Sequence, residues 1–272
     1  MDLEFMKLHG NGNDFILIDE YGCQCIPDEM KAQFAALYCD RRFGIGGDGV
    51  LYLQRSAKAD LRMRLFQPDE SEAEMCGNGI RCFTKYAYDT GYVEKTCSVE
   101  TMAGIIRVEM GYENDTFMAT IDMPEPKFNR KDIPATGEGE YRETIEGSEV
   151  YAVNSGVPHA VVFVDDVESV NPEEAGPAIR HHRTFPKGAN VNFVERAGGN
   201  TLRIRTFERG VEGETLSCGT GATAAAAIAH RLEYISSPVT VETKGGPLII
   251  HLGEVTRTTG PATTVFKGVI SF

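Results

Sequence analysis

The sequence lacks features that define whole classes of protein. No apolar run approaches the ~18 residues that would suggest a membrane-spanning helix. No tract is of low complexity, and residues 1–5 are acidic, without the basic segment ahead of an apolar stretch that marks a signal peptide. These absences favour a soluble globular protein that stays in the cytoplasm.

Positive charge is scarce as well. Lys and Arg number 27 against 40 Asp and Glu, which gives a formal net charge of −13. A protein that binds nucleic acid through its phosphates needs a basic stripe, and none is visible. We therefore expect a small-molecule substrate, with neither nucleic acid nor a membrane as a partner.

The cysteine spacings of redox and metal sites are missing too. The seven cysteines include no Cys-x-x-Cys pair, and no paired-His spacing accompanies them. We expect no disulfide framework and no metal, and we interpret His181 and His182 as solvated surface. Five cysteines are expected to be structural: Cys23, Cys25, Cys39, Cys82 and Cys97.

What the sequence does contain is a cysteine framed by glycines, twice. Residues 75–79 read Met-Cys-Gly-Asn-Gly and residues 217–221 read Ser-Cys-Gly-Thr-Gly, with Cys76 and Cys218 separated by 142 positions (218 − 76). The same offset carries Val-Glu-Thr at 99–101 onto Val-Glu-Thr at 241–243. A repeat this long indicates two copies of one domain, since solenoid repeats run ~20–50 residues.

The length agrees with a duplication. A chain of 272 residues suits two domains of about 130 residues each. Pro124 and Pro126 end a strand-like run and mark the boundary. We predict an N-terminal domain over 1–122 that carries Cys76 and to which about 264–272 return, and a C-terminal domain over 123–263 that carries Cys218.

Local patterns predict the architecture of each domain. Helices follow Gly79 and Gly221, and the second is so apolar that other elements should surround it. We predict the α/β class, of α+β type: two pseudo-symmetric duplicated domains, each a curled, mainly antiparallel sheet around a central helix. Short apolar or β-branched runs predict strands at 15–19, 50–53, 160–164 and 248–250.

Each framed cysteine lies just before its predicted helix. The positive end of the helix dipole and the unpaired N–H groups of the first turn favour a thiolate there. Such environments lower the pKa of a thiol from ~8.5 to ~3.5–7.5. The glycines let backbone N–H groups approach an anion, such as a substrate carboxylate.

Two such cysteines suit inversion of an amino-acid Cα. One as thiolate removes the Cα proton while the other, as thiol, delivers a proton to the opposite face. The titrations of such a pair are coupled. A tight turn with a small buried cysteine explains a single copy equally well, and duplication copies structure as well as function, so the repeat alone proves only that the halves are homologous.

The motifs around both cysteines resemble the diaminopimelate epimerase family, essentially end to end. The resemblance implies a cofactor-independent enzyme, without pyridoxal phosphate, that interconverts LL- and meso-diaminopimelate for lysine and, in many bacteria, for peptidoglycan. It also implies a substrate buried between two similar domains and a homodimer. The matching segments are 9–15 (His-Gly-Asn-Gly-Asn-Asp-Phe), 71–72, 75–82, 158–159, Asn190, 208–210 and 218–221.

The resemblance also assigns roles. Cys76 and Cys218 are the acid/base residues, and His159 and Glu208 orient or polarise the thiols. Residues at the two helix starts supply donors to the α-carboxylate. The substrate-binding residues that the resemblance implies are Asn13, Gln67, Gly77, Asn78, Asn190, Glu208, Arg209, Gly219 and Thr220.

The chain departs from the family pattern at four positions. Gln67 stands where Asn is common, Glu70 where Gly is familiar, Val157 where a substrate-binding Asn is frequent, and Gly49 where some members have Gln. Val157 can neither donate nor accept a hydrogen bond through its side chain. These changes bear on selectivity at the distal centre of the substrate rather than on the inversion chemistry.

Two other functions remain open. A racemase or epimerase of another amino acid would keep both cysteines, and a substrate panel scored by Cα deuterium exchange separates it. A thiol redox protein would use the cysteines as a reversible disulfide and would keep its function when either is changed singly to Ser with glutathione present.

Overall fold

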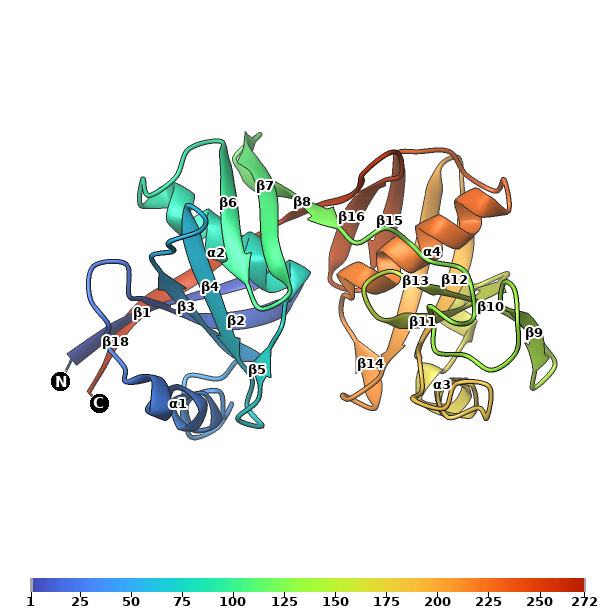
Figure 1. The fold of residues 1–272 in the computed structure, drawn as a ribbon, viewed down its shortest axis with the longest axis horizontal. Coiled ribbons are helices and arrows are strands. Elements are labelled where there is room, and N and C mark those ends of the chain that lie inside the picture. Colours follow the sequence, from blue (N-terminus) through green and yellow to red (C-terminus); the bar gives the residue numbers. More distant parts are fainter. Residues whose placement is uncertain (1, 272) are drawn as a thin grey trace. The chain divides into compact units, whose positions relative to one another are not determined.

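The chain folds into two compact units in a computed structural model that describes residues 2–271 (Figure 1). One unit comprises Met1–Ile121 with Gly260–Phe272, and the other comprises Asp122–Thr259. The first contains Cys76 and the second contains Cys218. No helix among residues 2–271 is long and apolar enough to cross a membrane.

The first unit is a curled sheet. Most neighbouring strands are antiparallel, but β2–β3 and β4–β6 are parallel. The chain's last strand, β18, pairs with its first, β1. The strands are β1 (Asp2–Gly10), β2 (Asn13–Asp19), β3 (Gly49–Gln54), β4 (Leu61–Phe66), β5 (Glu72–Ala73), β6 (Thr96–Thr101), β7 (Gly104–Glu113), β8 (Thr116–Met123) and β18 (Thr263–Ser271).

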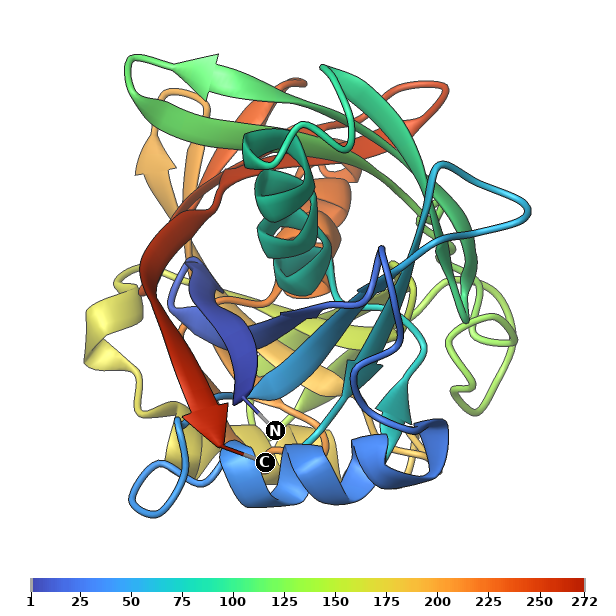
Figure 2. The same cartoon turned by 90° about the vertical axis from the view of Figure 1, so that its left-hand side faces the viewer.

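Helix α2 (Gly77–Asp89) lies inside the curl of this sheet, and Figure 2 shows the strands curling around it. Ile80, Phe83 and Ala87 recur at helical spacing and are completely buried. An apolar stripe of this kind must face other elements, which fixes how the helix lies in its unit. Its N-terminal end holds Cys76.

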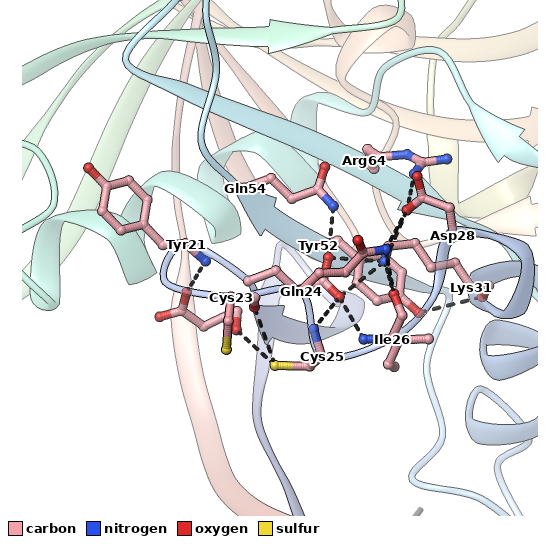
Figure 3. A network of polar contacts seen from close by, with 12 residues as sticks. Tyr21, Cys23, Gln24, Cys25, Ile26, Asp28, Lys31, Tyr52, Gln54 and Arg64 are labelled. Atoms are coloured by element: carbon pink, nitrogen blue, oxygen red, sulfur yellow. Dashed lines mark hydrogen bonds and ion pairs between the residues drawn. The ribbon is translucent and has the colours of Figure 1, made fainter.

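The outer face of the same sheet is covered by α1 (Lys31–Tyr38), which follows the short 3-10 helix η1 (Asp28–Met30). Phe34 of α1 packs into a core that includes Ile16 and Tyr52. Lys31 is fully buried within a network of polar contacts (Figure 3). It pairs with the buried carboxylate of Glu20 at 3.0 Å. Since breaking a buried pair leaves an uncompensated charge, this contact holds the loop before α1 in place.

The second unit repeats this design. Its parallel pairs, β11–β12 and β13–β15, stand where β2–β3 and β4–β6 stand in the first unit. The strands are β9 (Arg142–Ile145), β10 (Ser148–Asn154), β11 (Pro158–Val164), β12 (Asn190–Gly198), β13 (Thr201–Glu208), β14 (Gly213–Thr215), β15 (Val239–Thr243), β16 (Gly246–His251) and β17 (Thr256–Pro261).

Helix α4 (Gly219–Arg231) is the central helix of this unit. Its bounds are those of α2 moved by 142 positions (77 to 219, 89 to 231). Its small side chains are buried almost throughout, which lets the strands approach closely. The short 3-10 helix η2 (Val167–Ser169) and helix α3 (Pro172–Arg180) follow β11, and α3 contributes Ile179 to the core on the outer face.

The predicted fold class is confirmed: in each of the two duplicated units, mainly antiparallel strands curl around one central helix. The predicted strands lie within β2, β3, β11 and β16, and the two predicted helices are α2 and α4. Helices α1 and α3 were not predicted, nor were several strands, among them β7, β9, β10 and β12.

Candidate active site

Each framed cysteine caps its central helix. Cys76 has extended backbone angles (φ −141°, ψ 119°), and its Sγ accepts the N–H of Gly79 at 3.4 Å. Cys218 repeats this (φ −124°, ψ 109°), with Sγ accepting the N–H of Gly221 at 3.4 Å. In both units the sulfur occupies the place of a capping oxygen, where the helix dipole favours negative charge.

Asn13 places an amide beside Cys76. The tight turn between β1 and β2 has Asn11 at φ 53° and Gly12 at φ 83°, the left-handed pair that two-residue hairpins favour. Asn13 follows directly, and its Oδ1 lies 3.6 Å from the Sγ of Cys76. Its Nδ2 donates to Asp48 at 2.6 Å, so the amide is held at both ends.

Asn78 and Arg81 complete the surroundings of Cys76. The Nδ2 of Asn78 donates to the Oδ1 of Asn13 at 3.2 Å, and the guanidinium of Arg81 donates to the Oδ1 of Asn78 at 2.8 Å. A chain of hydrogen bonds therefore leads from a cation through two amides to the carboxylate of Asp48.

Next to this chain of hydrogen bonds, the carboxylate of Asp14 is held by two cations, Lys7 and Arg41. Burial alone would raise its pKa, but hydrogen bonds from Arg41 and Lys7 outweigh burial and lower the pKa of Asp14 to about 2. Arg41 reaches both Asp14 and Asp48 at 2.7 Å. These ion pairs hold the start of β3 against the start of β2, where Asn13 lies.

Cys218 has different neighbours. The hydroxyl oxygen of Thr220 lies 3.4 Å from its Sγ and 2.9 Å from the Nε2 of His159. His159 is completely buried, and burial together with the charge of Arg209 lowers its pKa to about 3. The imidazole is therefore neutral at neutral pH.

Asn192 indicates which nitrogen of His159 carries the proton. Its Oδ1 accepts the hydroxyl of Thr206 at 3.0 Å, so its Nδ2 faces the carbonyl of Ala160 at 2.9 Å and the Nδ1 of His159 at 3.0 Å. Asn190 also points its Nδ2 at the ring, but its distance to Nε2 is longer, 3.4 Å. We assign Nδ1 as the acceptor and Nε2–H as the donor to Thr220.

Asn190 links the imidazole to the end of β13. Its Oδ1 accepts the backbone N–H of Arg209 at 2.7 Å, and β12 aligns it with His159 on β11. The guanidinium of Arg209 donates to the carbonyl oxygens of Lys187 and Gly188 at 3.3 and 3.4 Å. Glu208, the last residue of β13, pairs with the first residue of β14.

The structure thus groups the predicted residues by unit. In the first, Asn13, Cys76, Gly77 and Asn78 come together, while Gln67 lies in the exposed β4–β5 turn, where its Oε1 accepts the hydroxyl of Ser71 at 3.0 Å. In the second, hydrogen bonds and adjacent positions connect a larger set: His159, Asn190, Glu208, Arg209, Cys218, Gly219 and Thr220.

Sequence reasoning missed four polar contributors. Asn192 is completely buried, and an Asn-x-Asn pair in an apolar strand puts two amides on one face. Ser155 is also buried and donates to the carbonyl of Thr220 at 2.8 Å. Arg81 lies within the matching segment 75–82 and Asp48 directly precedes β3, but the sequence alone gives neither of them a partner.

Four of the other thiols are held in the neutral form by burial. Burial raises the pKa of Cys39, Cys82 and Cys97 to about 12 in each case, and it raises the pKa of Cys25 as well. Within residues 2–271, no three or more His, Cys, Asp or Glu side chains gather in a group that could hold a metal ion. His181 is largely exposed, 3.3 Å from Glu212.

A duplicated curled sheet around a central helix defines a structural class that solved structures share. A phenazine biosynthesis protein of the PhzF family from Bacillus anthracis superimposes with a TM-score of 0.74 at 17% identity and complete coverage of both chains. A hydroxyproline epimerase from Agrobacterium vitis gives a TM-score of 0.67 at 17% identity, covering 99% of this chain and 92% of that one. At such identities the likeness shows the fold alone.

Sequence comparison is far more specific. The profile of the family described as diaminopimelate epimerase matches residues 5–128 and 151–265. The diaminopimelate epimerase of Methanothrix thermoacetophila is 56% identical over 271 residues, with 99% of this chain and 96% of the relative covered. That of Archaeoglobus fulgidus is 49% identical over 275 residues. The chain belongs to the diaminopimelate epimerase family, as the resemblance predicted.

Proposed function

We propose that the chain interconverts LL- and meso-diaminopimelate by two-base proton transfer at Cα, without a cofactor. The observation that carries this proposal is the pair of cysteines, Cys76 and Cys218, that cap their helices with nearly equal backbone angles and equal N–H···S distances. Family membership supplies the substrate class.

The chemistry balances over one turnover. The thiolate of one cysteine takes the Cα proton and becomes a thiol, and the electron pair left on Cα delocalises into the α-carboxylate. The thiol of the other cysteine delivers its proton to the opposite face of Cα and becomes a thiolate. The protonation states of the two cysteines are thereby exchanged, so the enzyme is now in the form that converts the product isomer back.

The residues at the helix starts have a supporting role in this proposal. Gly77 and Gly219 are the first helical residues, and Asn78 and Thr220 follow them. Their N–H groups at the positive ends of the helices are suited to the α-carboxylate, whose negative charge increases as Cα loses its proton. The remaining proposed substrate contacts are Asn13, Gln67, Asn190, Glu208 and Arg209.

His159 orients Thr220 and, through it, the second thiol. A neutral imidazole that donates from Nε2 leaves the Thr220 hydrogen directed at the Sγ of Cys218. Donation to sulfur stabilises the thiolate, so the imidazole assists without being charged itself. Glu208, close in sequence, is the proposed second orienting residue.

Incubation of purified protein with LL-diaminopimelate, in the absence of pyridoxal phosphate, tests the substrate assignment. We expect the meso isomer to form until the two are near equilibrium. Loss of all turnover after Cys76→Ala, with folding retained by circular dichroism, would agree with a direct role for that thiol. Unchanged LL substrate with wild-type protein would contradict the assignment.

A second candidate is an epimerase or racemase of another amino acid. Val157 and Gln67, which replace amide side chains of the family pattern, favour it because they alter the groups available to a distal amino acid. A panel of amino acids and cyclic imino acids, scored by Cα deuterium exchange, decides between them. Faster exchange in any member than in diaminopimelate would replace our first proposal.

A further inference from the structure

Arg81 is a buried cation whose hydrogen-bond acceptors are all neutral. Its side chain is completely buried in the first turns of α2. It donates to the Oδ1 atoms of Asn11 and Asn78, both at 2.8 Å, and to the carbonyl oxygens of Pro261 and Gly77 at 3.1 and 3.4 Å. Within residues 2–271 no carboxylate forms a salt bridge with it.

Burial of an ion without a counter-ion is unfavourable even when its donors are satisfied. Burial accordingly lowers the pKa of Arg81, and the groups that act in the opposite direction are Cys82 and Cys76. Burial raises the pKa of Cys82 to about 12, so that thiol is neutral at neutral pH. Cys76 is left as the group beside Arg81 that can become an anion.

Packing of the fold does not explain the arginine. The position that corresponds to Arg81 in the second unit (81 + 142) is Thr223, which is also completely buried. Thr223 donates to the carbonyl of Gly219 at 2.9 Å and contacts Thr258 at 3.2 Å. The same helix position therefore accepts a small neutral side chain in one copy and a cation in the other.

We propose that Arg81 is a positioning residue for Cys76: it fixes the orientation of the Asn78 and Asn13 amides and supplies the positive charge that favours the Cys76 thiolate. This inference rests on the proposed function of Cys76 as an acid/base residue and adds the group that controls its charge.

The orientation follows from what each group can donate. A guanidinium has donors only, so Asn78 must present Oδ1 to Arg81, which directs its Nδ2 to the Oδ1 of Asn13. Asn13 in turn presents Nδ2 to Asp48. Its Oδ1 therefore faces the Sγ of Cys76, where it accepts the proton of the thiol form.

Opposing influences thus act on one sulfur. The Oδ1 of Asn13 favours the thiol, while Arg81, the N–H of Gly79 and the helix dipole favour the thiolate. A residue that must both give and take a proton needs its two forms close in free energy, and the balance depends on Arg81. A nearby opposite charge favours the ionised form of a thiol.

Site-resolved alkylation tests this without a substrate. Intact protein is treated briefly with iodoacetamide at about pH 5 to 9, and the labelling of Cys76 and Cys218 is quantified separately by peptide mass spectrometry. For Arg81→Gln, which keeps donors and removes the charge, we expect the Cys76 midpoint to rise by about one pH unit or more, or about tenfold slower labelling below the midpoint. The Cys218 midpoint should not move.

Three further variants sharpen the result. Arg81→Lys keeps the charge and should leave the Cys76 midpoint closer to wild type than Arg81→Gln does. Thr223→Val, at the corresponding position, should leave the Cys76 midpoint unchanged. If Arg81→Gln fails to fold, Asn78→Asp places a carboxylate against Arg81. The new carboxylate offsets the positive charge of Arg81, so the Cys76 midpoint should rise.

An unchanged Cys76 midpoint in folded Arg81→Gln, or in folded Asn78→Asp when the first variant does not fold, would overturn the inference, as would equal shifts at both cysteines. Epimerisation of diaminopimelate by the wild-type protein is scored separately. A failure of the inference about Arg81 is thereby distinguished from a failure of the proposed function.

Discussion

At the scale of the residue, the two candidate acid/base groups share a backbone and differ in their neighbours. Cys76 faces an amide oxygen and lies near a buried cation, whereas Cys218 faces the hydroxyl of Thr220. Duplication preserved the helix cap, and substitution around it made the two thiols unequal. Unequal thiols suit a reaction in which one starts charged and the other neutral.

His159 should make the protein less stable in mild acid. Its pKa is about 3 in the folded state against about 6.5 in an unfolded chain. The unfolded state therefore binds a proton below about pH 6.5 that the folded state refuses until about pH 3, and the free energy of unfolding falls as pH decreases across that window.

Urea unfolding at several pH values measures this effect. We expect His159 to contribute a slope of up to about 1.4 kcal/mol per pH unit, which His159→Gln removes. His230→Gln, at an exposed position, serves as the control and should keep the wild-type slope. Equal slopes in wild type and His159→Gln would show that the histidine is not buried in its neutral form.

At the scale of the element, the first turn of each central helix has a glycine two positions after its start. A Cβ on Gly221 would lie 2.5 Å from the Oδ1 of Asn192, whereas a Cβ on Gly79 would meet nothing closer than 3.4 Å. Gly221→Ala should thus displace Asn192, cost about 1–3 kcal/mol in urea unfolding and lower kcat.

Gly79→Ala is the matched control. The added methyl has ordinary contacts and a helical site, so we expect a change in unfolding free energy of less than about 1 kcal/mol. Equal losses of stability in the two variants would contradict the assigned packing of Asn192 against α4.

The turn between β4 and β5 contains a strained residue. Glu70 has φ 69°, in the left-handed region that favours glycine. Glu70→Gly should raise the free energy of unfolding by up to about 1 kcal/mol. Glu74→Gly, at a residue without a positive φ, should lower the free energy of unfolding. A lower value for Glu70→Gly as well would contradict the strain argument.

Elements with strong periodicity were predictable from the sequence, and elements held by polar contacts were not. Strands β2 and β11 are short apolar runs, and the buried stripe of α2 recurs at helical spacing. Helix α1 was not predicted because its first residue, Lys31, is buried against Glu20, whereas a lysine normally indicates an exposed position. Helix α3 contains Pro177, which normally argues against a helix interior.

The candidate site was predictable where a motif is contiguous. The cysteines and their glycines stand together in sequence, so the helix caps followed directly. The partners of Asn192 and Ser155 could not be predicted, because strand pairing and a hairpin bring these residues to His159 and Thr220 from distant positions. Buried polar partners of this kind depend on the register of the sheet.

At the scale of the whole molecule, we expect a homodimer, as the family resemblance implies. Strand β18 exposes Val265 and Val269, whose side chains are 54% and 59% exposed. Exposed apolar side chains on one strand are suited to burial against a second copy.

Light scattering after size exclusion tests this expectation. The wild-type mass should be about twice that of the 29.8 kDa chain. Val269→Lys should shift the mass toward the monomer by adding a charge to the apolar surface, whereas Val255→Lys, also at an exposed valine, should not. A monomeric wild-type protein, or an unchanged dimer in Val269→Lys, would exclude β18 as the dimer surface.

The account as a whole depends on two thiols acting on one carbon. The most direct measurement is the first turnover of LL-diaminopimelate in deuterated water, with isotope content read by mass spectrometry for wild type, Cys76→Ser and Cys218→Ser. We predict that the meso product carries one solvent deuteron at Cα while the recovered LL substrate carries almost none, and that neither variant inverts the centre. Meso product that retains the original proton at the inverted Cα, or full inversion by either single variant, would contradict the two-thiol account.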